Sequence, residues 1–247
     1  MQEFRDLEGS RRVAGIPFRN PDSAMHIVDL SMPIAPHFRW PVELSIKGDI
    51  AAGDQFRVSK INGPCHGFSH VDAPAHFVAG APTIEATPLK QVVGPCRVLD
   101  LSGRPANEPI GPEHLAAADP GGADGEILLL ATQWNDRRDY NDKSFWTEAP
   151  WLTLEAAQWL AQRKPTAVAF DFPQDYPIRL LLEGKEVPKP EHLTHHVLLS
   201  HGVTLIEYVV NTGKLTAPRN LFSAAPLLIP NADGAPARIY AIEGLAV

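Results

Sequence analysis

The stretch HGFSHVDAPAH, residues 66–76, places three histidines and one aspartate within a short segment. Gly67 and Pro74 disfavour a continuous helix through it. In an extended chain, residues two and four positions apart point to the same face of the strand. His66, His70 and Asp72 would then project together. We therefore predict a strand-like run that carries a cluster of polar side chains on one face.

Imidazole and carboxylate groups are the ligands that suit Zn²⁺, Mn²⁺ and Fe²⁺. The spacing therefore predicts a metal site, and the alternative is a buried polar network on one face. A helical zinc-protease motif would carry a glutamate directly after the first histidine, where this chain has Gly67. The histidine content supports a metal site, because seven of the ten histidines fall within 66–76 and 192–201.

Two rival nucleophiles lie in the same stretch. Ser69 precedes His70, but the segment lacks the second glycine of a G-x-S-x-G motif, and neighbouring side chains of a strand point apart. Cys65 could act as a nucleophile or contact a metal, against the alternative of a plain buried thiol. Ser69 and Cys65 are therefore kept as alternatives to a water molecule, activated by a metal ion, as the attacking nucleophile.

The composition is that of a globular protein, with 247 residues of which 44% are hydrophobic and 21% charged. A net charge of −7 without a basic block argues against nucleic-acid binding. Cys65 and Cys96 form no disulfide framework, and we expect them to be reduced. Residues 1–20 contain no apolar leader and no apolar run approaches about 18 residues. We expect a cytoplasmic protein that does not enter a membrane.

Short apolar runs separated by the 24 prolines predict many turns and short strands. We find no repeat or linker, so residues 1–247 are predicted to form a single α/β domain with a mixed sheet. The predicted strands are 26–32, 42–50, 55–61, 126–132, 166–170, 203–208, 225–229 and 237–242. The predicted helices are 112–118, 153–163 and 190–201, and turns are expected at Gly53-Asp54 and at 231–234.

At residues 66–76 the chain resembles the cyclase family of metal-dependent hydrolases, which includes bacterial kynurenine formamidases and isatin hydrolases. The family signature is HxGTHxDxPxH, and His66, His70, Asp72, Pro74 and His76 fall in register with it. Phe68 stands where the family usually has Gly, and Ser69 where it has Thr, which affects the shape of the substrate pocket more than the ligands. The resemblance continues over most of the chain, at 29–31, 40–41, 223–226 and 235–238.

This resemblance implies a swivelling β/β/α fold, a homodimer or tetramer, and one or two Zn or Mn ions per chain. His66, His70 and Asp72 would hold one ion, and Asp72 would bridge to a second held by His195 and Glu207. His196 is the alternative to His195 as the downstream metal ligand. Both histidines could instead lie on a solvated helix face without binding metal. His76 would be the catalytic general acid and base.

The implied reaction is attack of a metal-activated water on an amide-type C–N bond, in an aryl formamide or a cyclic amide such as isatin. The alternatives are a lactone or ester hydrolase of the same fold and a non-catalytic metal-binding or small-molecule-binding protein. Phe38, Trp40 and Phe68 are candidates for binding an aromatic substrate, with core or interface packing as the alternative. Polar residues of segment 171–176, including Gln174, could line the site or stabilise a turn.

Overall fold

Nine strands of the protein form one mixed sheet, in a computed structural model that describes residues 25–122 and 124–245. Their order is β1-β13-β11-β5-β7-β9-β10-β4-β12. The strands are β1 (His26–Asp29), β2 (Glu43–Gly48), β3 (Val58–Asn62), β4 (His70–Asp72), β5 (Val93–Asp100), β6 (Pro109–Ile110), β7 (Ile127–Ala131), β8 (Trp151–Leu152), β9 (Ala167–Phe170), β10 (Thr204–Glu207), β11 (Arg219–Ser223), β12 (Gly234–Pro236) and β13 (Tyr240–Glu243). The helices are α1 (Leu89–Val92), α2 (Pro112–Ala118), α3 (Trp134–Arg137), α4 (Lys143–Thr147), α5 (Leu154–Gln162), α6 (Pro177–Leu182) and α7 (Leu193–Ser200).

The centre of the sheet is parallel and buried on both faces. Strands β5, β7, β9 and β10 run parallel to one another. Every residue of β7 is buried, because Leu128 and Leu130 pack in one apolar core while Ile127 and Leu129 pack in a second. Such double burial explains why β7 is a continuous apolar run instead of an alternating one.

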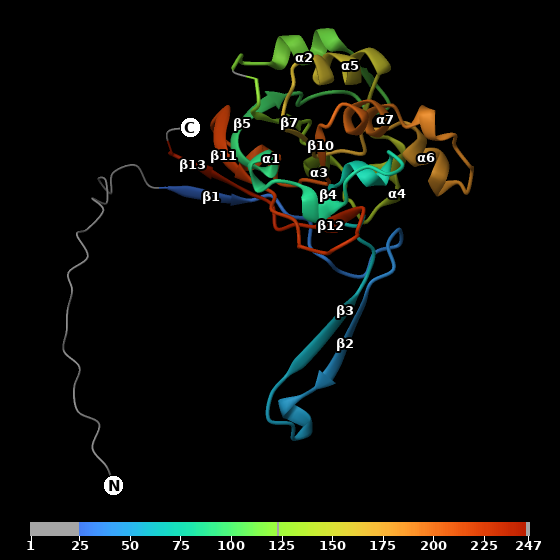
Figure 1. Ribbon diagram of the computed structural model, residues 1–247, viewed down its shortest axis with the longest axis vertical. Coiled ribbons are helices and arrows are strands. Elements are labelled where there is room, and N and C mark those ends of the chain that lie inside the picture. The colour runs from blue at the N-terminus through green and yellow to red at the C-terminus, as the bar shows by residue number, and fades with distance from the viewer. Residues whose placement is uncertain (1–24, 123, 246–247) are drawn as a thin grey trace, which may run out of the picture.

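Helices cover the first of these cores. α5 packs against both α2 and α7, and Figure 1 shows these helices together above the central strands. The Thr153 side chain accepts a hydrogen bond from the Ala156 amide and so begins α5 where the sequence predicts. This layer holds α7 beside β10, and His195 in the first turn of α7 reaches Asp72 of β4.

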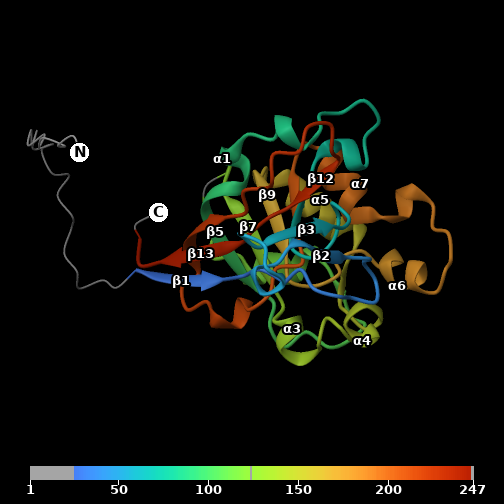
Figure 2. The same cartoon turned by 90° about the horizontal axis from the view of Figure 1, so that it is seen from below.

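Strand β4 connects the parallel centre to the last strand of the sheet. It pairs antiparallel with β10 on one side and with β12 on the other. At the opposite end of the sheet β1 lies beside β13, as both views show (Figures 1 and 2). Strands β2 and β3 form a separate hairpin that projects from the body.

The mixed α/β class is confirmed, and most predicted elements lie within a few residues of those observed. The strand predicted at 225–229 is wrong, because only an isolated bridge between Pro226 and Ala237 forms there. The helix predicted at 190–201 is split into a 3₁₀ turn, Lys189–Glu191, and α7. The elements that were not predicted are strands β5, β6, β8, β11 and β12 and helices α1, α3, α4 and α6.

Residues 1–20, for which the sequence predicts no apolar leader, lie outside the described residues. Among the described helices, none combines the length and apolar character that crossing a membrane requires.

Candidate metal centre

Strand β4 turns the side chains of His70 and Asp72 to one face, as the two-residue spacing predicts. The register with β10 places Glu207 directly opposite His70. His70 Nε2 lies 3.2 Å from Asp72 Oδ1 and 3.5 Å from Glu207 Oε2. All three residues are buried, so their polar atoms face one another instead of water.

Helix α7 contributes His195 to the same group. Its Nε2 atom lies 3.0 Å from Glu207 Oε1 and 3.5 Å from Asp72 Oδ2. His195 is 6% exposed, whereas His196 is exposed to solvent. The structure therefore brings His195 to the cluster and leaves His196 outside it.

His66 and His76 complete the cluster on its more open side. His66 lies in a turn before β4, and its Nδ1 atom is 2.8 Å from Asp72 Oδ1. His76 lies in the 3₁₀ turn Pro74–His76, and its ring stacks on that of His66 at 3.8 Å. The segment is thus a short strand between two turns, not the single strand-like run predicted. Asp233 contacts both rings, at 3.0 Å from His66 Nε2 and 3.5 Å from His76 Nδ1.

The charges of the cluster depend on these contacts. Burial raises the pKa of Asp72, but His70, His195 and His66 hold it well below its usual value. Burial also raises the pKa of Glu207. The charge of the nearby His195 lowers it by more, so that the pKa of Glu207 falls to about 2. Both buried carboxyl groups are therefore anionic at neutral pH. They form a centre of negative charge that needs cations around it.

The imidazoles respond in opposite ways. Burial lowers the pKa of His66, but the hydrogen bond and charge of Asp72 raise it to about 8. Burial likewise lowers the pKa of His195, and Glu207, Asp175 and Asp72 raise it well above its usual value. For His76 burial dominates and lowers the pKa. His66 and His195 therefore hold protons beside the carboxylates, while His76 is neutral.

The donor set fits one or two divalent cations. Two groups bring their ligand atoms within 4.8 Å of one another, His66 with Asp72 and His76, and His70 with Asp72 and Glu207. Asp72 belongs to both groups, so it could bridge two ions. Asp72 Oδ2, His70 Nε2 and His66 Nε2 are buried and make no hydrogen bond in the described part of the chain. Such unsatisfied atoms are costly unless a ligand satisfies them, and nitrogen with carboxylate oxygen suits zinc or manganese.

Backbone geometry at Phe68 orients one of these imidazoles. Phe68 has a φ angle of 58°, in the left-handed region that favours glycine. Its carbonyl oxygen lies 2.8 Å from His70 Nδ1. A proton on Nδ1 donated to this carbonyl leaves Nε2 of His70 facing Asp72 and Glu207. The family signature usually has glycine at this position, where the backbone is left-handed. Phe68 adopts this left-handed conformation at a cost in free energy.

The three predicted substrate-binding residues lie in different surroundings. Phe68 and Trp40 are 3% and 6% exposed and pack on each other at 4.8 Å. Trp40 also packs against Tyr208, whose ring is 5.5 Å from that of His70. Phe38 is 47% exposed. Of the three, only Phe38 offers a ring to solvent, while the other two support the wall behind His70.

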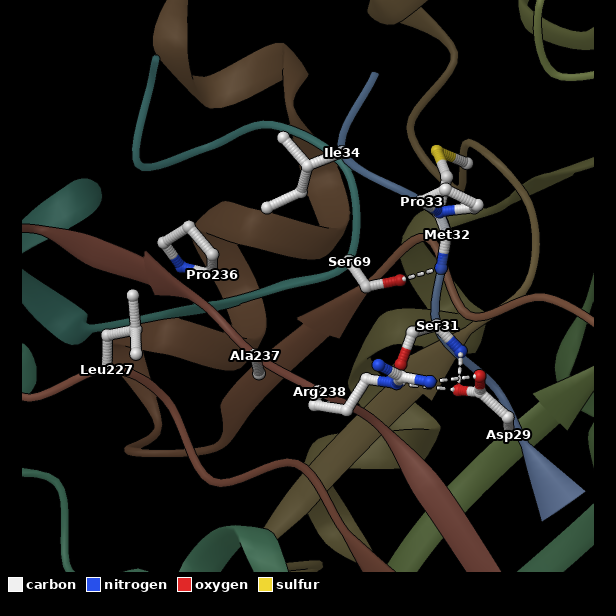
Figure 3. A pocket seen from close by; sticks show the side chains of 10 residues that line it. All are labelled: Asp29, Ser31, Met32, Pro33, Ile34, Ser69, Leu227, Pro236, Ala237 and Arg238. Carbon is white, nitrogen blue, oxygen red and sulfur yellow. Dashed lines mark hydrogen bonds and ion pairs between the residues drawn. The ribbon is translucent and has the colours of Figure 1, made fainter. Parts of the chain in front are cut away.

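The rival nucleophiles are occupied or protonated. Ser69 is 2% exposed, and its hydroxyl donates to the Tyr208 carbonyl and accepts from the Met32 amide. Figure 3 shows the Met32 bond at the edge of a pocket of about 350 Å³. Burial raises the pKa of the free Cys65 thiol. Neither side chain is prepared for nucleophilic attack.

Phe77, Asp175 and Asp233 lie at the site and were not predicted individually, whereas Gln174 was named as a possible contact. Phe77 stacks on His195 at 4.9 Å, and Asp175 Oδ2 lies 2.5 Å from His195 Nδ1. The Gln174 side-chain amide donates to Glu207 Oε1. Gln174 and Asp175 belong to the polar segment 171–176 singled out in the sequence, but nothing local indicates Asp233 or Phe77.

The chain is similar to known proteins over most of its length. The family model described as "Putative cyclase" matches residues 28–174. A kynurenine formamidase from Bordetella petrii is 31% identical over 83% of this chain and 86% of its own length. One from Bacillus cytotoxicus is 27% identical over 85% of this chain and 94% of its own.

Solved structures show the same fold. A structure described as a potential metal-dependent hydrolase with cyclase activity is 28% identical, with a TM-score of 0.68 over 89% of this chain and 98% of that one. Isatin hydrolase A from Labrenzia aggregata is 21% identical, with a TM-score of 0.73 over 90% of this chain and 94% of its own. Since the family model matches more than half of the chain, and the sequence relatives cover most of it, this protein belongs to the cyclase family of metal-dependent hydrolases.

Proposed function

We propose that this protein is a metal-dependent hydrolase of an amide-type C–N bond, in an aryl formamide or a cyclic amide. The observation that carries the proposal is the convergence of the imidazoles of His66, His70 and His195 on the Asp72 carboxylate. Several of the buried ligand atoms there make no hydrogen bond in the described part of the chain. His66, His70 and Asp72 would hold one Zn or Mn ion. Asp72, His195 and Glu207 would hold a second.

The chemistry of the centre follows from its charge. A divalent cation held there would lower the pKa of a water molecule towards about 7 and polarise a carbonyl oxygen. The two buried carboxylates would balance the charge of one such cation, or half of the charge of two, and fix their place. His70 presents Nε2 because Phe68 occupies its other nitrogen. The two carboxylates and His70 would therefore act by binding the cation and fixing its position.

His76 is placed for proton transfer. Its side chain is 27% exposed, at the open side of the cluster, and the ring stacks on His66. Because burial lowers its pKa, the ring is neutral near pH 7 and can accept a proton. It would take the proton from water and return it to the leaving nitrogen, which then departs as a neutral amine.

The proposed substrate class rests on the names of the relatives, kynurenine formamidase and isatin hydrolase. Phe38 is exposed, and Trp40 and Phe68 lie behind His70. In this proposal the exposed ring of Phe38 would meet a flat substrate, and the buried rings of Trp40 and Phe68 would support the site from behind.

The deciding experiment is metal content per chain, measured by elemental mass spectrometry on gently purified protein and on the His70→Ala variant. One or two equivalents of Zn or Mn that disappear in His70→Ala would support the centre. Turnover of N-formylkynurenine and of isatin by the loaded protein then tests the reaction. No metal even after reconstitution would contradict the proposed hydrolase mechanism.

The proposal extends to a cytoplasmic homo-oligomer. Both cysteines are free thiols, as a reducing compartment requires. The projecting hairpin β2–β3 has an apolar face that the described part of the chain leaves exposed, and a second copy would cover it.

A further inference from the structure

Asp175 is a buried carboxylate directly behind one of the proposed ligands. It lies in the segment between β9 and α6 and is 2% exposed. Asp175 Oδ2 is 2.5 Å from Nδ1 of His195. In the described part of the chain, His195 is the one basic side chain within ion-pair distance of Asp175. The contact therefore joins a buried acid to a single imidazole nitrogen.

The same carboxylate holds the start of helix α7. Oδ1 accepts the Thr194 amide at 2.8 Å, and Oδ2 accepts the His195 amide at 3.3 Å. His192, the residue before the helix, makes no capping bond with its side chain. Asp175, which lies in another segment of the chain, thus caps the N-terminus of α7. The same carboxylate fixes both the backbone and the ring of His195.

This geometry determines which nitrogen of His195 faces the cluster. With Nδ1 engaged by Asp175, the ring presents Nε2 to Glu207 Oε1 and Asp72 Oδ2. A carboxylate behind an imidazole keeps the proton on Nδ1 and raises the electron-donating strength of Nε2. Phe77 stacks on the ring and restricts its rotation from another side.

We propose that Asp175 is a positioning residue that holds His195 with Nε2 towards Asp72 and Glu207 and so sets the affinity of the second cation. The inference rests on the two-cation centre proposed above. Asp175 does not itself touch the substrate in this assignment, because His195 stands between it and the cluster.

The test compares Asp175→Asn with Asp171→Asn. Asp171 is a matched control, since it is fully buried in the same segment and accepts four hydrogen bonds, from Thr132, Gln133 and Thr212, without touching a ligand. Asparagine at 175 can still accept the Thr194 amide with its oxygen, but its NH₂ group in the place of Oδ2 can accept neither the His195 amide nor a proton from Nδ1. Zn²⁺ titration against a chromophoric chelator measures both affinities, and circular dichroism measures folding.

We expect Asp175→Asn to bind the first equivalent like the wild type and the second about 10 to 100-fold more weakly. Asp171→Asn should bind both equivalents with unchanged affinity. Combining Asp175→Asn with His195→Gln should weaken the second equivalent no further than His195→Gln alone, because Asp175 acts through that ring. Equal affinities in the Asp175→Asn and wild-type proteins would overturn the inference, as would an equal loss in Asp171→Asn.

Two further outcomes separate the inference from the function on which it rests. A wild-type chain that binds only one equivalent would refute the two-cation centre, and the assignment of Asp175 would fall with it. If Asp175→Asn does not fold, ¹⁵N NMR of the Zn²⁺-loaded wild type locates the proton of His195. A proton on Nδ1 supports the positioning role, and a proton on Nε2 contradicts it.

Discussion

At the scale of single residues, each buried imidazole of the centre has one nitrogen committed to the protein. His70 gives Nδ1 to a backbone carbonyl, and His195 gives Nδ1 to a carboxylate. In both rings Nε2 is left facing the carboxylates. The neutral carbonyl behind His70 and the anionic carboxylate behind His195 would make the two rings unequal donors, so the two cations should differ in affinity.

His76→Ala should separate chemistry from metal binding. We expect the variant to retain its metal and to lose about 10² to 10⁴-fold in kcat, because proton transfer to the leaving nitrogen no longer has a nearby group. His196→Ala is the matched control, since His196 is exposed and outside the cluster. Steady-state kinetics with metal content measured on the same samples checks the result. Full activity in metal-loaded His76→Ala would show that another group transfers the proton.

At the scale of elements, strand β12 sets how closely the turn at His66 approaches β4. A Cβ atom on Gly234 would lie 2.6 Å from Cε1 of His66 and 2.9 Å from the Val71 carbonyl oxygen. A methyl group there must push the His66 ring away, because the strand backbone cannot yield as easily. Gly234 therefore leaves the space that the His66 ring needs to reach the proposed metal centre.

Gly234→Ala should consequently weaken binding of the cation assigned to His66, His70 and Asp72, on the order of tenfold, with the fold retained. Gly94→Ala in β5 is the control, since a Cβ atom there meets nothing within 4 Å. Isothermal titration with Zn²⁺ on both variants measures the effect. Wild-type affinity in Gly234→Ala would mean that His66 is not a ligand in this position.

The parts of the site that the sequence predicts are those with local geometry. His70 and Asp72 share a face because they are two residues apart in a strand, which requires no knowledge of the rest of the fold. His195 and Glu207 depend on the family resemblance. Asp233 depends on the sheet order, since it approaches His66 only because β12 pairs with β4. Pairings between distant strands leave no local pattern in a sequence.

The same reasoning explains the errors in the elements. Strand β5 contains Gly94 and Pro95, which weaken any strand pattern, yet it pairs on both sides with β7 and β11. Segment 225–229 has the apolar composition of a strand, but Leu227 and Leu228 are 60% and 78% exposed. Tertiary pairing, not composition, decided both outcomes.

At the scale of the whole molecule, the centre couples stability to pH and to metal. Without metal, the pKa of His66 is raised from its usual 6.5 to about 8, chiefly by Asp72 against the opposing effect of burial. A raised pKa in the folded state contributes stability below pH 6.5 that is lost as the pH rises through 8. His195, whose pKa is also raised well above its usual value, acts in the same direction.

Chelated protein should therefore lose thermal stability between pH 6.5 and 8, where His66 gives up its proton. Zn²⁺-loaded protein should lose less over this range, because a cation replaces the protons beside Asp72 and Glu207. At a free concentration of 100 times its Kd, the metal stabilises the fold by about 2.7 kcal/mol per site. Differential scanning calorimetry of both forms checks this, and a chelated protein with a flat pH profile would contradict the assigned charges.

The hairpin β2–β3 has one apolar and one polar face. Leu44 and Ile61 are cross-strand neighbours, with Ile46 two residues along the same face, and they are 71%, 57% and 49% exposed. The opposite face carries Ser45 paired with Lys60. An isolated two-stranded hairpin is marginally stable, so its apolar face needs a cover. Residues 43–62 carry three acidic and three basic side chains, so identical hairpins do not repel each other by net charge.

We accordingly expect a second copy of the chain to cover this face, with the protein sedimenting as a dimer or larger oligomer. The double variant Leu44→Ser and Ile61→Ser should shift the sedimentation velocity profile towards monomer, because it removes the apolar pair that the partner covers. Lys60→Ser, on the polar face of the same hairpin, should leave the oligomer intact. A monomeric wild type, or a double variant that still sediments with the wild type, would show that the hairpin does not join two copies.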